Sequence, residues 1–134
     1  MTLRETAILG LLGFGIWLSG AVMFRVGGAF LFENGWPILA ASAVGIALSV
    51  CLLLSSVMSW RKAPASQSVT VAVVMTLPGL LGDVAYILNF SRITGLQPAT
   101  AGPFAAVLIF GTAVLFAYAL ARQTVVFTPP PALH

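Results

Sequence analysis

Charge is the scarcest property of this 134-residue sequence: only 7% of its residues are charged, whereas 60% are hydrophobic. Soluble domains carry about 25% charged residues. A soluble chain of this length could not keep so much apolar surface away from water. A membrane protein has no such need, because lipid is its solvent. The composition therefore predicts an integral membrane protein.

Histidine and cysteine are almost absent, which excludes several kinds of site. His134, the only histidine, ends the sequence, so a haem or chlorophyll-type pigment lacks its commonest ligand within a span. Cys51, the only cysteine, excludes an internal disulfide and is interpreted as a small buried residue. There is no Ser/His or Cys/His pair for covalent catalysis and no acid pair within the spans for a metal. We expect no enzyme and no cofactor, with a bound lipid or quinone left open.

Basic residues outnumber acidic residues six to three, but they form no basic stripe. They lie at the ends of apolar runs, where membrane proteins keep them. The pattern therefore predicts no nucleic-acid partner. The expected partners are the lipid bilayer and either other membrane-protein subunits or further copies of this chain.

Four apolar runs divide the sequence, at residues 6–24, 37–58, 69–90 and 99–121. At about 1.5 Å per residue, a helix of about 20 residues spans a hydrocarbon core of about 30 Å. We predict an all-α, polytopic membrane protein: a single membrane domain over residues 1–134 with four transmembrane helices in an up-down bundle. A signal peptide cleaved near Ser19-Gly20-Ala21 is the competing interpretation of the first run, but the apolar stretch continues past that site.

The segments outside the runs are expected to be irregular. Residues 25–36 are predicted to form a loop at the membrane interface, with Phe30, Phe32 and Trp36 at headgroup depth. Pro37 suits the first position of the second helix. Residues 122–134 are predicted to form a Pro-rich tail, since Pro129-Pro130-Pro131 favours polyproline II.

The basic residues are divided unequally between the two sides of the predicted bundle. Four spans place both termini on one side. Because cytoplasmic loops carry the excess of Lys and Arg, the division predicts that both termini are cytoplasmic. The terminal side holds Arg4, Arg61, Lys62 and Arg122, and the other side holds Arg25 and Arg92.

Small residues recur every four positions in the second and fourth runs and are frequent in the first. Such spacing lets transmembrane helices approach closely. The predicted helix-packing residues are Gly13, Ser19, Ala41, Gly45, Ser49, Ala113 and Ala117.

The third run contains Asp83, the only acid inside an apolar run, shortly after Pro78-Gly79. Steps of three and four residues from Asp83 define a seam on one helix face. This seam should face the bundle interior, because a charge in hydrocarbon costs at least about 2.5–3.5 kcal/mol. Pro78 removes a backbone hydrogen bond, which predicts a kink just before Asp83. The seam comprises Ala72, Thr76, Gly79, Asp83, Tyr86 and Phe90, while Leu77, Leu81, Val84 and Leu88 point elsewhere.

Asp83 has two main interpretations. In the structural one, Arg25 or Arg92 extends inward to pair with it, Tyr86 donates to it, and the pair only fixes helix packing. In the functional one, Asp83 forms a proton or cation site together with Thr76, Tyr86 and the Pro78-Gly79 bend. A contact to a lipid headgroup, a quinone or a partner subunit is a third alternative.

Two motifs carry a family resemblance: Leu77-Pro-Gly-Leu-Leu-Gly-Asp83, and Gln97-Pro-Ala-Thr-Ala-Gly102 at the start of the last run. Over residues 36–120 or so, the chain resembles a family of small bacterial four-span membrane proteins without an assigned function. The resemblance implies four helices in a bacterial plasma membrane and transfers no catalytic residue. Small multidrug transporters and fluoride channels share the size and span count. However, Glu5 precedes the first span, so the glutamate of the former is missing, and the signatures of the latter do not match.

Two functional hypotheses follow. The first is a non-catalytic accessory or structural subunit of a larger membrane complex, of respiratory or photosynthetic type. It is favoured by the small-residue stripes and by the expectation that four short helices leave little room for an internal cavity, and it predicts that Asp83 is paired or at an interface. The alternative is a small oligomeric transporter or channel, in which Asp83 faces a cavity as the proton or cation site.

Overall fold

The computed structural model describes residues 1–125, so the tract Pro129–Pro131 and His134 of the predicted tail lie outside the described residues. Four long helices dominate this part of the chain, and it contains no strand. Each is long and apolar enough to cross a membrane. The prediction of an all-α membrane protein with four spans is therefore confirmed. The long helices are α1 (Leu3–Glu33), α2 (Trp36–Trp60), α3 (Ser68–Leu88) and α5 (Ala101–Val125).

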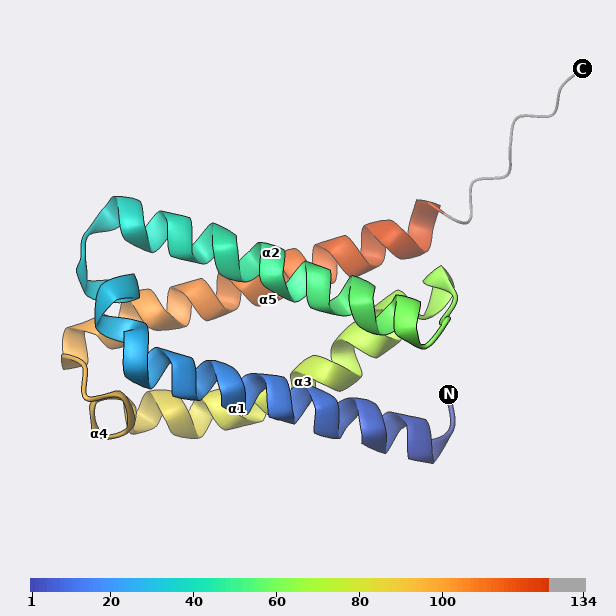
Figure 1. The fold of residues 1–134 in the computed structure, drawn as a ribbon, viewed down its shortest axis with the longest axis horizontal. Helices are drawn as coiled ribbons and strands as arrows, with labels where there is room; N and C mark the ends of the chain where they lie inside the picture. The colour runs from blue at the N-terminus through green and yellow to red at the C-terminus, as the bar shows by residue number, and fades with distance from the viewer. Residues whose placement is uncertain (126–134) are drawn as a thin grey trace, which may run out of the picture.

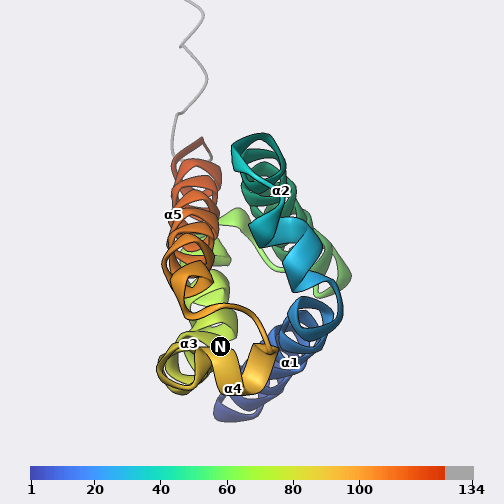
Figure 2. The ribbon, with the colours of Figure 1, turned by 90° about the vertical axis from the view of Figure 1, so that its left-hand side faces the viewer.

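The four helices form an up-down bundle. The N-terminus and the end of α5 lie at the same end of the molecule (Figure 1). Seen along the bundle, the helices occupy the four corners of a square (Figure 2). The main packing interfaces join α1 to α3, α3 to α5, and α5 to α2, whereas α1 and α2 contact each other less.

The predicted loop over residues 25–36 is wrong in most of its length. Helix α1 continues to Glu33, and only Asn34 and Gly35 separate it from α2. The segment contains no proline, and the helical conformation buries its Phe32 side chain in the core. Figure 1 shows the last turns of α1 bending towards the start of α2. Gly28 and Phe32 are buried on this extension, four and eight residues after the buried Phe24.

The remaining boundaries agree more closely with the prediction. Helices α2 and α3 begin and end within two residues of the predicted spans. The connection after α3 holds two short helices, α4 (Phe90–Thr94) and η2 (Pro98–Thr100), and a third, η1 (Ala65–Gln67), precedes α3. Gly95 ends α4 with φ +75°, a left-handed conformation that suits glycine. The tail prediction is wrong for residues 122–125, which continue α5.

The core has two separate hydrophobic clusters. One lies towards the termini and includes Leu9, Met58, Val71 and Ala119. The other surrounds Phe104, whose ring centroid lies 5.2–5.4 Å from the rings of four aromatic residues. These are Phe24, Phe32, Tyr86 and Phe90. On α3, Asp83 falls between the residues of the two clusters, so the bundle carries a polar group at a break in its core.

Candidate binding site around Asp83

Helices α1 and α3 approach each other closely because glycines face the contact. A Cβ atom on Gly13 would lie only 1.9 Å from the backbone oxygen of Met75. On α3, Cβ atoms at Gly79 and Gly82 would lie 3.0 Å and 2.6 Å from Trp17 ring atoms. The two α3 glycines therefore form a flat surface that receives the Trp17 indole.

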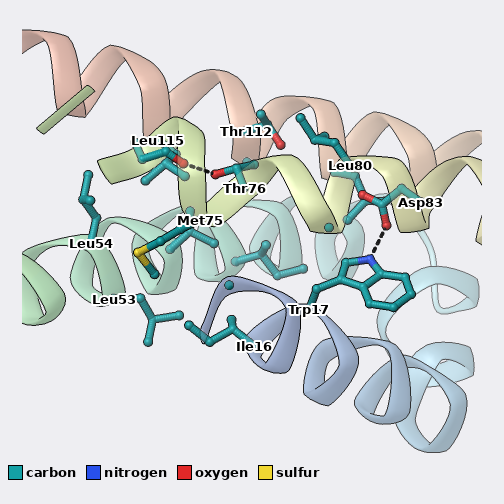
Figure 3. Close-up of a pocket in the computed structure, with 17 residues that line it drawn as sticks. Ile16, Trp17, Leu53, Leu54, Met75, Thr76, Leu80, Asp83, Thr112 and Leu115 are labelled. Atoms are coloured by element: carbon teal, nitrogen blue, oxygen red, sulfur yellow. Dashed lines mark hydrogen bonds between the residues drawn. The ribbon is translucent and has the colours of Figure 1, made fainter. Parts of the chain in front are cut away.

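Trp17 holds Asp83 by a hydrogen bond. The indole Nε1 donates to Asp83 Oδ1 across 2.7 Å, from the middle of α1 to α3 (Figure 3). The indole is itself positioned by Phe14, which stacks on it at 5.6 Å, and by Tyr86, which meets it edge-on at 6.3 Å. No described residue donates to Asp83 Oδ2, so this oxygen of the carboxylate is left to accept from another molecule.

The expected ion pair of Asp83 with Arg25 or Arg92 is not formed. Arg25 donates instead to the Ile93 carbonyl in α4, and Arg92 is exposed. The Tyr86 hydroxyl donates to the Ala21 carbonyl at 3.2 Å rather than to Asp83. Arg25 therefore lies beside α4, at the end of the bundle opposite the termini. Within residues 1–125 the only salt bridge joins Arg61 to Glu5, at 2.7 Å.

Asp83 lines a cavity between the four long helices. Its volume is about 160 Å³, and residues of α1, α2, α3 and α5 contribute to its wall. The expectation of little room for an internal cavity is therefore wrong. Gly13, Gly79 and Gly111 line it without side chains, which leaves the centre of the bundle unfilled. The polar side chains in the wall are Trp17, Thr76, Asp83 and Thr112 (Figure 3).

A second cavity of about 440 Å³ lies between α3 and α5 alone. Four residues line both cavities, so the two spaces adjoin at Asp83. We call this second space the α3–α5 groove. The shared residues are Leu80, Asp83, Leu108 and Thr112.

The burial of α3 follows the predicted seam. Ala72, Gly79 and Tyr86 are buried, as is Phe90 at the start of α4, and Thr76 and Asp83 are half-buried. The four residues predicted to point elsewhere are exposed: Leu77, Leu81, Val84 and Leu88. Pro78 lies halfway along the 21-residue α3, and the helix changes direction about midway, as the predicted kink requires (Figure 1).

Of the seven predicted helix-packing residues, only Gly13 is buried within the bundle. The inner faces of α2 and α5 carry larger side chains, such as Leu54 and Leu115. The small residues predicted for packing on these helices therefore face outward. The six exposed ones are Ser19, Ala41, Gly45, Ser49, Ala113 and Ala117.

Residues 29–125 match the model of a family of unknown function (DUF5367). The chain belongs to this family. The match agrees with the resemblance found in the sequence and includes Gly79, Gly82, Asp83 and Thr112. Most of α1, with Gly13 and Trp17, lies before the matched region of DUF5367. No curated protein and no solved structure matches the chain.

The sequence interpretation missed Trp17, Gly82 and Thr112. A signal for Trp17 was present, because Trp36 and Trp60 lie at the ends of their helices, where tryptophan prefers the membrane interface. Trp17 instead lies in the middle of α1, away from both interfaces. An indole N–H there needs an acceptor, and the only acid in the spans is the obvious candidate.

Proposed function

We propose that this DUF5367 protein is a small transporter or channel that works as an oligomer, with Asp83 as its proton- or cation-binding group. One observation carries the proposal: Asp83 lines the cavity between the four helices and has no cationic partner among the described residues. An ionisable residue inside a membrane is costly and typically marks an ion or substrate pathway. The bend at Pro78 beside it supports the proposal, since broken helices recur at such sites.

We further propose a bacterial plasma membrane as the location, with both termini in the cytoplasm. The family resemblance supports the first part. The distribution of charge supports the second, because Arg25 and its contact Ile93 lie at the end opposite the termini. The terminal end carries the larger number of basic residues, as the positive-inside rule requires for a cytoplasmic side.

Asp83→Asn is expected to abolish transport of protons or cations. The amide keeps the size of the side chain and an oxygen for the Trp17 indole, but it cannot take up a proton or balance a positive charge. The measurement is proton flux into vesicles that contain the purified protein and a pH-sensitive dye. We expect a loss of rate of about 100-fold or more, in the range that single acid–base groups contribute to proton transfer.

Glu33→Gln is the matched control for this experiment. It removes the same charge from an exposed acid at the end of α1, where Glu33 accepts hydrogen bonds from Gln97 and Thr100. Flux in this variant should equal that of the wild type. Equal flux in wild type and a folded Asp83→Asn protein would contradict the proposal.

An accessory subunit of a larger membrane complex, respiratory or photosynthetic in type, is the second candidate. The exposed small residues of α2 favour it, because Ala41, Gly45 and Ser49 offer a partner helix a close approach. A Cβ on Gly45 would meet no atom within 4 Å, so Gly45→Leu should fold normally yet block such a contact.

Sizing after mild-detergent extraction tests this second candidate. The wild-type protein should co-migrate with the other subunits of the complex, and the Gly45→Leu variant should migrate separately from them. A particle that contains only copies of this chain would reject the accessory role and leave the oligomeric transporter. The proposal includes no catalytic step and no cofactor in either case.

A further inference from the structure

We infer that the Asp83 site binds a lipophilic amine, a molecule with one protonated nitrogen and an apolar body, which enters from the bilayer through the α3–α5 groove. The inference rests on the proposed function, because it names the substrate class of the same site.

Every polar group free to meet a ligand in this cavity can accept a hydrogen bond, and only the Thr112 hydroxyl can also donate one. Asp83 Oδ2 receives no hydrogen bond from the described residues. The Thr76 hydroxyl donates its proton to the Ala72 carbonyl at 2.6 Å, so its oxygen can only accept a hydrogen bond from a ligand. Thr112 lines both cavities and adds a further hydroxyl oxygen. An ammonium group has only hydrogen-bond donors, and its positive charge is opposite to that of the Asp83 carboxylate. It therefore complements this wall.

The same wall offers a quinone or an anion one free donor, the Thr112 hydroxyl, and no cation from the described residues. Such ligands present acceptor oxygens and need N–H or O–H donors. The indole N–H of Trp17 is already engaged by Asp83 Oδ1. The basic side chain nearest in sequence, Arg92, is exposed beyond the end of α3. The wall therefore discriminates between ligands by the direction of their hydrogen bonds as well as by charge.

The dimensions indicate a ligand with a small head and room for a tail. A volume of about 160 Å³ is close to that of the roughly 150 Å³ apolar cavity that accepts benzene in another protein. The remainder of the ligand can extend into the α3–α5 groove, which offers about 440 Å³ more. The single acid in the wall matches a single positive charge.

The groove gives the ligand a route from the lipid. It is formed by α3 and α5 only, and several of its wall residues face outward. Ile109 is 70% exposed and Val84 is 59% exposed. Leu80 and Leu108 line both the groove and the central cavity, so their side chains stand at the passage between the two spaces. An amine dissolved in the bilayer would therefore meet Asp83 without first crossing to water.

The ligand class is tested with the fluorescence of Trp17. Trp36 and Trp60 are 77% and 72% exposed, so both are replaced by Phe to leave Trp17 as the only indole. The protein in lipid nanodiscs is titrated with amino-TEMPO, a nitroxide quencher that carries a primary amine. Hydroxy-TEMPO, which has the same ring and no charge, is the matched probe.

We expect saturable quenching by amino-TEMPO at concentrations at least about tenfold lower than by hydroxy-TEMPO, since a hydrogen bond to a charged partner supplies such a difference. Asp83→Asn should remove this preference. Equal quenching by the two nitroxides, or a preference that survives in Asp83→Asn, would overturn the inference about ligand class.

The route is tested by filling the groove. Ala113 lines it and is exposed, whereas Ala117 is also exposed on α5, one turn later, but does not line it. Ala113→Phe should slow the onset of quenching by amino-TEMPO several-fold without changing its final extent. Ala117→Phe should leave both unchanged. The same rate in the two variants would overturn entry through the groove.

The flux and quenching experiments separate failure of this inference from failure of the proposed function. Amine-selective quenching in a protein without flux would retain the binding site and reject the transporter. Flux that depends on Asp83, in a protein that quenches equally with both nitroxides, would retain the transporter and reject the amine.

Discussion

Replacing Gly13 by alanine is expected to destabilise the bundle more than any other single methyl group. The added Cβ would lie 1.9 Å from the Met75 oxygen and 2.6 Å from its carbonyl carbon, and these are backbone atoms that cannot rotate away. Helices α1 and α3 would have to separate along the interface that carries Trp17 and Asp83. Overpacking costs about 1–3 kcal/mol and sometimes more, and we expect the upper end here. The measurement is the free energy of unfolding in detergent.

Gly15→Ala is the control for this substitution. Gly15 lies on the same helix, but a Cβ there would meet no atom within 4 Å. Its stability should be unchanged or slightly raised, because alanine is the better helix former by roughly 0.5–1 kcal/mol. Similar stabilities for Gly13→Ala and Gly15→Ala would show that α1 and α3 do not approach in this way.

Trp17→Phe is expected to have the second-largest effect. It removes the donor to Asp83 Oδ1 and leaves a half-buried carboxylate without any partner among residues 1–125. An unsatisfied buried acceptor costs about 1–3 kcal/mol, and more when it is charged. Trp36→Phe, at an exposed indole, should change the free energy of unfolding little.

A double-mutant cycle isolates the contact between the two side chains. Asp83→Leu removes the acceptor, so Trp17→Phe should cost less in that background than in the wild type. We expect a coupling of about 0.5–3 kcal/mol, as for residues that share a hydrogen bond. Strictly additive effects would mean that Trp17 and Asp83 do not interact.

The fold could be predicted from the sequence because transmembrane spans have a strong sequence signal. A run of about 20 apolar residues has few alternatives to a transmembrane helix. The inward seam of α3 could also be predicted, since the cost of placing Asp83 in lipid fixes which face turns inward. The extension of α1 could not, because the burial of Phe24 and Phe32 against Phe104 is a tertiary contact that no local pattern records.

The partner of Asp83 was predicted wrongly for a related reason. Arg25 and Arg92 are favoured as partners by their opposite charge, and a sequence offers only the distance along the helix as a measure of their proximity to Asp83. The structure shows instead that close approach depends on Gly13, Gly79 and Gly82, which bring an indole to the carboxylate. The role of these three glycines can be recognised only once the pairing of α1 with α3 is known. The cavity is equally a property of the packed bundle and not of any one segment.

Asp83 is an ionisable group that Trp17 holds inside the bundle, and it forms no ion pair with residues 1–125. The most direct test is ¹H–¹⁵N NMR of the three indole N–H groups in lipid nanodiscs, assigned by Trp→Phe substitution and followed as pH changes. We expect the chemical shift of the Trp17 indole alone to change as Asp83 titrates, and to remain constant in Asp83→Asn. A Trp17 signal whose chemical shift does not depend on pH, or changes equally in Asp83→Asn, would show that Asp83 is not an ionisable group bound to Trp17.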